Sequence, residues 1–281
     1  MNKQYKKKKP RVTREELGAK ITQHIEALAT ATDEALVSSV MGDFLDSCAK
    51  FHKYSPGNQF LIQCFHPGAT FVAGYNDWKT KHKRYVTSKA KGKGIPILAP
   101  NVYKTDRDDP DSGYEIRGFR VVYVYDVSLT DGEPLPPTPD WKSPEMDAKL
   151  SIRLTAFATE QGIEVEITEQ HDGAQGRSLG GKIQLDPSAG TKTFIHELAH
   201  ELLHKNGAGF CSKPPKIREL EAEAVGYVVA THFGISGLAS PNYIALNGAT
   251  SEEILAHMKV IRDCATCIIK AIEEKKDGSD N

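Results

Sequence analysis

Apolar residues in the first 65 positions recur every three or four residues, which is the spacing of an amphipathic helix. This pattern predicts helices over residues 13–31, 33–54 and 58–65. Thr13 and Glu16 fit a capping box at the start of the first helix. From residue 70 onward, β-branched and aromatic residues predict strands at 70–73, 94–98 and 119–127, with a short helix at 78–84.

Beyond residue 145 the helical spacing returns and alternates with short strand patterns. It predicts helices over 146–161, 191–205, 217–233 and 251–275. Strands are expected at 162–167 and 177–185, the second bent at Gly180 and Gly181. Residues 181–185 are a candidate edge strand for pairing with an extended peptide.

A cluster of prolines separates the two halves. Five of the fifteen prolines lie between residues 134 and 144, and such a segment continues neither a helix nor a central strand. We interpret 131–145 as a linker between a domain at 13–130 and a second at 146–281, with 1–12 as a disordered basic arm. The predicted fold class is α+β.

Charge supports this division. The whole chain has 36 basic and 37 acidic residues, but 1–130 carries 21 against 14 (+7) and 131–281 carries 15 against 23 (−8). A polyanion is the natural partner of the basic half. Five cysteines are too few for a disulfide scaffold, and no uninterrupted apolar run approaches a membrane span. We therefore expect a cytoplasmic protein with no membrane partner.

A basic run in the first half is a candidate site for single-stranded DNA. Seven cations and no acidic residue occupy 79–93, with three aromatic residues near them whose rings offer stacking surfaces for bases. Gly92 and Gly94 would let the backbone approach a phosphate. The alternatives are a solvated face for the cations and a core position for Trp78. The candidate DNA-binding residues are Lys79, Lys81, Lys83, Arg84, Lys89, Lys91, Lys93, Tyr75, Trp78 and Tyr85.

The motif His196-Glu197-Leu198-Ala199-His200 falls on a predicted helix. Histidines four residues apart project from one face and suit Zn²⁺, while Glu197 lies beside the ion as a general base and acid. The alternative is a pair of buried structural histidines. His204, one turn further on, is interpreted as a supporting residue or as a cation at the C-terminus of the helix rather than as a ligand.

A catalytic zinc site needs a third protein ligand. Glu219 and Glu223 share one face of the next predicted helix. One assignment places Glu219 on the metal and Glu223 beside a ligand histidine, where it holds the tautomer; the reverse assignment stays open. Glu221 points elsewhere and fits a solvated acidic face.

These motifs resemble two known groups. His196–His200 followed by Glu219-Leu220-Glu221-Ala222-Glu223 resembles the ImmA/IrrE-type zinc metallopeptidases, although Glu223 replaces their Asn or Asp. In the first half, Tyr54–Ile62, Val72–Trp78, Gly94–Pro100 and Gly118–Val127 resemble the single-stranded-DNA-binding domain of ArdC-type antirestriction proteins.

The resemblance implies a zincin-like second domain in a mobile-element protein that protects incoming DNA. The resulting hypothesis is a peptidase whose zinc is held by His196, His200 and Glu219, with Mn²⁺ as another suitable ion and an unidentified protein as substrate. Two alternatives are a DNA-binding shield that cleaves nothing and a protease that cuts a regulator.

Overall fold

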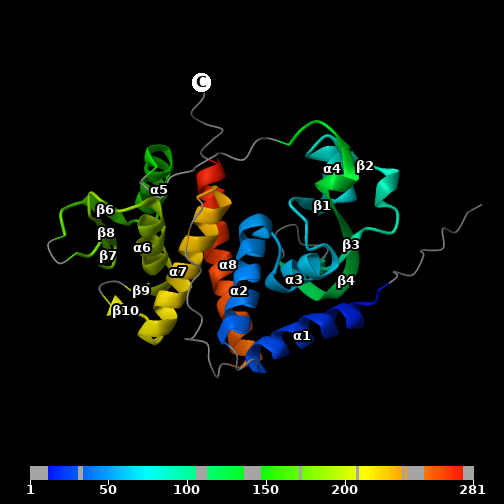
Figure 1. Ribbon diagram of the computed structural model, residues 1–281, viewed down its shortest axis with the longest axis horizontal. Coiled ribbons are helices and arrows are strands. Elements are labelled where there is room, and N and C mark those ends of the chain that lie inside the picture. The colour runs from blue at the N-terminus through cyan, green and yellow to red at the C-terminus, as the bar shows by residue number, and fades with distance from the viewer. Residues whose placement is uncertain are drawn as a thin grey trace, which may run out of the picture. The chain divides into compact units, whose positions relative to one another are not determined.

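The computed structural model describes residues 12–30, 34–105, 113–135, 147–170, 173–206, 209–235, 238 and 250–274. Nearly all of the predicted basic arm and most of the proline-rich segment lie outside these ranges. The chain divides into two compact units: Met1–His24 with Gly57–Leu135, and Ile25–Pro56 with Pro136–Asn281. Helices and short strands occur in both, so the fold class is α+β (Figure 1).

The first unit is built on antiparallel strands. β4 (Tyr114–Asp126) lies between β1 (Val72–Gly74) and β3 (Ile95–Lys104). A second ladder pairs β2 (Arg84–Val86) with β5 (Thr130–Gly132). The helical segments are α3 (Pro56–Phe65), α4 (Tyr75–Thr80), η1 (Ser88–Ala90), η2 (Val127–Leu129) and the first part of α1 (Arg14–Thr30). The capping box predicted at Thr13 is confirmed, because its amide donates to Glu16 and its hydroxyl accepts from the Glu16 amide.

Two buried polar side chains hold this unit together. The Asn58 amide on α3 donates to the Leu98 carbonyl and accepts from the Leu98 amide, both at 2.9 Å, which attaches the helix to β3. The Trp78 indole is fully buried, and its Nε1 donates to the Tyr125 carbonyl at 2.9 Å. The buried polar groups of Asn58 and Trp78 therefore both have partners, as a stable core requires.

The second unit surrounds helix α7 (Pro215–His232). It also contains α2 (Glu34–Phe51), α5 (Ala148–Glu160), α6 (Thr191–His204) and α8 (Ser251–Glu274). In Figure 1, α7 lies next to α6, α8 and α2, all of which pack against it. Small side chains on α7 let these neighbours approach: a Cβ added at Gly226 would lie 3.9 Å from the His196 Cα.

The unit's strands form a small mixed sheet. β8 (Lys182–Leu185) is central, parallel to β6 (Glu164–Ile167) and antiparallel to β7 (Gly176–Ser178). The expectation that 181–185 form an edge strand is wrong, because both sides of β8 are already paired. The bend at Gly180 and Gly181 is confirmed: both have φ of +83°, and they turn the single predicted strand into a β7–β8 hairpin. A further short ladder joins β9 (Lys205–Asn206) to β10 (Gly209–Phe210).

Helix α2 belongs to the second unit, which differs from the predicted domain boundaries at 130 and 145. The Tyr227 hydroxyl on α7 donates to Asp46 on α2 at 2.8 Å, and His232 Nδ1 lies 2.7 Å from the Ala49 carbonyl oxygen. Helical periodicity predicts that α2 is amphipathic, but it does not say which helix its apolar face covers. None of the described helices is long and apolar enough to cross a membrane.

Candidate metal centre

Helix α6 carries the two motif histidines on one face. His196 and His200 are one helical turn apart, and their Nε2 atoms lie 3.0 Å from each other. Phe194, Ile195, Leu198 and Ala199 are fully buried around them, so this part of the helix is anchored in the core. The local fold therefore points both imidazoles to one place.

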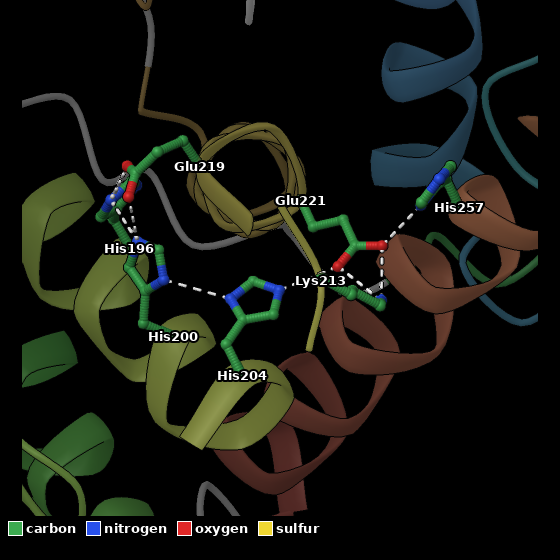
Figure 2. Close-up of polar contacts among 7 residues, drawn as sticks. All are labelled: His196, His200, His204, Lys213, Glu219, Glu221 and His257. Atoms are coloured by element: carbon green, nitrogen blue, oxygen red, sulfur yellow. Dashed lines mark hydrogen bonds and ion pairs between the residues drawn. The ribbon is translucent and has the colours of Figure 1, made fainter. Parts of the chain in front are cut away.

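Helix α7 brings a carboxylate to the same place (Figure 2). Glu219 Oε2 lies 3.5 Å from His196 Nε2, and Glu219 Oε1 lies 3.5 Å from His200 Nε2. A tetrahedral ion with ligand bonds of about 2.0–2.1 Å places its ligand atoms about 3.3 Å apart. The three observed separations bracket that value, so these residues fit a divalent ion. They form the one group of potential metal ligands of this kind among the described residues.

The charges of this group are complementary. Burial lowers the pKa of His196, but hydrogen bonds with Glu219 and Glu223 outweigh it and raise the pKa to about 9. Hydrogen bonds with His196 and His200 hold the pKa of Glu219 far below its usual range. The Glu219 side chain is 66% exposed, so the side of the candidate metal site that Glu219 forms is open to solvent. A site that admits a substrate needs such an opening.

Glu197 lies beside the histidines and against β7. It is only 9% exposed, and burial raises the pKa of its carboxyl group. Gly176 on β7 leaves the space that Glu197 occupies, because a Cβ at Gly176 would lie 2.8 Å from the Glu197 Cγ. A carboxylate with a raised pKa next to the candidate ligands is suited to accept and return a proton.

Glu223 lies on the far side of His196. Its Oε2 is 3.2 Å from His196 Nδ1, the ring nitrogen that does not face His200 or Glu219. The Lys192 ammonium pairs with the other oxygen of Glu223. The structure thus places Glu219 at the convergence point and Glu223 behind a histidine, which is the first of the two assignments left open by the sequence.

Glu221 does not lie on a solvated acidic face; that interpretation is wrong. Its side chain is fully buried, with oxygens 2.8 Å from His204 Nε2, 2.8 Å from Lys213 Nζ and 2.6 Å from His257 Nδ1 (Figure 2). Burial raises the pKa of this carboxyl group, but these hydrogen bonds reverse the effect and lower it. Residues that are distant in the sequence supply the partners, so spacing along α7 could not reveal them.

The basic run of the first unit divides into free and engaged cations. Lys79, Lys89, Lys91 and Lys93 are exposed, and within the described ranges none of them forms an ion pair. The Lys81 ammonium lies 2.9 Å from Asp77, and that of Lys83 lies 3.6 Å from Glu133. Tyr75 and Tyr85 are exposed, so their rings are accessible for stacking.

Three sequence-based interpretations in this unit need correction. Trp78 is fully buried and presents no ring face to a base. The Arg84 guanidinium is used inside the protein: it donates to the Thr130 hydroxyl at 2.8 Å and to the carbonyls of Thr130, Gly132 and Glu133. Gly94 faces tyrosine rings, because its added Cβ would lie 3.1 Å from atoms of Tyr123 and Tyr125. These three residues therefore support the fold.

Comparisons with known proteins give a structural similarity only. No family model matches the chain, and no curated protein matches it. The chain is similar to crystal structures of the antirestriction protein ArdC from plasmid R388. The metal-free structure gives a TM-score of 0.42 at 16% identity and covers 80% of this chain and 84% of that chain. The Mn(II)-bound structure gives 0.45 at 15% identity and covers 94% and 98%.

Glu201 is a supporting residue that no sequence motif marks. It follows His200 on α6, and its carboxylate accepts from the Ser178 hydroxyl at 2.6 Å and from the amides of Gly180 and Gly181 at 2.8 and 2.7 Å. Glu201 therefore attaches the β7–β8 hairpin to α6. This attachment keeps Gly176 of β7 next to Glu197. No spacing rule marks such a residue, because its partners lie in a turn some twenty positions earlier.

Proposed function

We propose that this protein is a metal-dependent peptidase with a single-stranded-DNA-binding unit, and that it protects DNA entering the cytoplasm on a mobile element. The peptidase proposal depends on one observation: His196, His200 and Glu219 present three ligand atoms at the separations of a tetrahedral site, with the carboxylate of Glu197 beside them.

The chain's own residues would divide the work of peptide hydrolysis. A bound divalent ion supplies Lewis-acid chemistry, which makes water more acidic and a carbonyl carbon more electrophilic. Glu197 takes the proton from the attacking water and delivers it to the leaving amine, so one carboxylate serves as base and then as acid. Glu223 orients the imidazole of His196.

Removal and return of the metal test the peptidase proposal. The protein is incubated with a chelator, dialysed and reloaded separately with Zn²⁺ and with Mn²⁺, since imidazole and carboxylate ligands accept both. Hydrolysis of a mixed library of fluorogenic peptides should disappear in the stripped protein and return with at least one ion. Hydrolysis that persists at full rate after the metal has been removed would contradict the proposal.

The DNA-binding proposal depends on four exposed lysines that form no ion pair with the residues that the structure describes, Lys79, Lys89, Lys91 and Lys93, together with the exposed rings of Tyr75 and Tyr85. Contacts with phosphates release counterions, so binding should be tolerant of sequence and sensitive to salt. Lys81 and Lys83 already have acidic partners and should contribute less.

Changing these four lysines to Gln should weaken binding of a labelled oligothymidine at low salt. The slope of log affinity against log salt should become shallower by about 0.7 for each phosphate that the protein no longer neutralises. Fluorescence anisotropy across a salt series measures both quantities. The matched control changes four exposed lysines of the other unit, Lys50, Lys149, Lys216 and Lys259, and so alters net charge equally. Equal reductions of affinity in the two variants would contradict a site at the basic run.

A further inference from the structure

The two candidate histidine ligands are supported in different ways. His196 Nδ1 faces a carboxylate directly, since Glu223 Oε2 lies 3.2 Å away. His200 Nδ1 faces another imidazole: it lies 3.1 Å from His204 Nδ1. The other ring nitrogen of His204 is 2.8 Å from Glu221 Oε2. Figure 2 shows this row of side chains leading away from the metal centre, His200, then His204, then Glu221.

The protons in this row have one consistent arrangement when a metal is bound. His200 Nε2 points to His196 and Glu219, so it must keep its lone pair for the ion, and the ring proton must be on Nδ1. His204 Nδ1 then has to accept that proton's hydrogen bond. The proton of His204 is therefore on Nε2, from which it donates to the Glu221 carboxylate. Each donor in the row meets one acceptor.

The end of the row is an anion that the fold keeps charged. Glu221 and His204 are both fully buried. The Lys213 ammonium lies 2.8 Å from both oxygens of Glu221 and balances its charge, and His257 Nδ1 adds a contact at 2.6 Å. Removing charges from water is costly unless they are paired and hydrogen-bonded. Glu221, His204, Lys213 and His257 together meet this requirement. Of these, His204 contacts the candidate ligand His200.

We propose that His204 and Glu221 are positioning residues for the metal centre. Through two successive hydrogen bonds they hold His200 in the Nδ1–H tautomer and strengthen its Nε2 as a donor to a divalent ion. Metal affinity then depends on a carboxylate that does not touch the metal. This inference rests on the proposed metal centre and adds to it two residues that tune His200 but not His196.

Two substitutions at residue 204 separate the two hydrogen bonds. The Asn side-chain oxygen occupies roughly the place of His Nδ1, so His204→Asn keeps an acceptor for His200 but loses the link to Glu221. The Gln amide reaches roughly the place of His Nε2, so His204→Gln keeps a donor for Glu221 but loses the link to His200. Loss of an outer partner typically lowers metal affinity about 10–100-fold. We expect affinity for Zn²⁺ to fall in the order wild type, His204→Asn, His204→Gln.

Competition with a chromophoric chelator on the full-length chain measures these affinities with Zn²⁺ alone, without any substrate. Melting temperatures of the metal-free variants report their effects on the fold. The matched control is His232→Asn and His232→Gln, because His232 is a histidine of the same unit bound to Ala49 and Glu273. Zinc affinity should not change in the control pair. Equal zinc affinities for wild type and both His204 variants would overturn the proposal. Losses of zinc affinity that simply parallel the decreases in melting temperature of the variants would also overturn it.

Nitrogen NMR of the wild-type protein tests the same inference without a substitution. In the Zn²⁺-loaded protein the imidazole spectra should show His200 protonated at Nδ1 and His204 protonated at Nε2. A His204 ring protonated at Nδ1 would overturn the proposal. If the wild type binds no Zn²⁺ at all, the proposed metal centre itself is wrong. If it binds Zn²⁺ and only the His204 expectations are not met, the metal centre stands and this inference alone is wrong.

Discussion

Replacing Glu197 by Gln is expected to lower the rate of peptide hydrolysis by about 10²–10⁴-fold, the usual contribution of a positioned general base. Gln has nearly the same shape as Glu and fills the space that Gly176 leaves, but it cannot accept a proton. Because Glu197 is not among the converging ligand atoms, zinc affinity should be unchanged. Initial rates on the zinc-loaded protein and chelator competition measure the two quantities.

The matched control is Glu252→Gln, the same chemical change at an exposed position on α8, which should keep the wild-type rate. A Glu197→Gln protein that hydrolyses peptides at the wild-type rate would contradict the role given to Glu197.

The Glu197→Gln variant also distinguishes a peptidase from a DNA-binding shield that cleaves nothing. Full protection of incoming DNA in cells by Glu197→Gln would show that protection does not depend on peptide cleavage.

Removing Glu219 is expected to weaken Zn²⁺ binding by more than about 100-fold, because the change removes a ligand rather than an outer partner. Glu219 is the one carboxylate within 3.5 Å of both His196 Nε2 and His200 Nε2 among the described residues. The comparison is Glu223→Ala on the same helix face, which removes the carboxylate at His196 Nδ1 and the partner of Lys192 but no converging ligand atom. In that variant zinc affinity should fall by about 10–100-fold.

Chelator competition on the two variants gives the ratio of their affinities. A larger decrease in Glu223→Ala than in Glu219→Ala would reverse the assignment of ligand and supporting residue. Glu219 is also mostly exposed, so Glu219→Ala should leave the melting temperature of the metal-free protein nearly unchanged. A change in metal affinity can then be attributed to the missing ligand and not to a damaged fold.

Features that depend on local chemistry could be predicted from the sequence. The helix that carries the motif was predicted at 191–205 and spans Thr191–His204, because its apolar spacing matches its buried side. The capping box at Thr13 and Glu16 forms as the local pattern indicates. Helical geometry also places Glu219 and Glu223 on one face of α7, but which of them meets the Nε2 atoms of the histidines depends on how α7 packs against α6.

Features that depend on distant partners could not be predicted. Glu221 looks like an exposed acidic residue in the sequence, but Lys213 on the preceding loop and His257 on α8 bury and neutralise it. Arg84 belongs to a basic run by sequence, yet β5 supplies the carbonyls that occupy its guanidinium. Trp78 had two equally reasonable roles, and only the position of the Tyr125 carbonyl decides between them. In each case tertiary contacts override a local pattern.

The central claim is that side chains from two helices, α6 and α7, bind one divalent ion. Anomalous diffraction at the zinc absorption edge, from crystals of the full chain grown with Zn²⁺, tests it most directly. The account predicts one strong anomalous peak per chain, at a Zn²⁺ ion bonded to the Nε2 atoms of His196 and His200 and to the carboxylate of Glu219. The absence of a peak there, or a peak on other residues with these three side chains pointing apart, would contradict it.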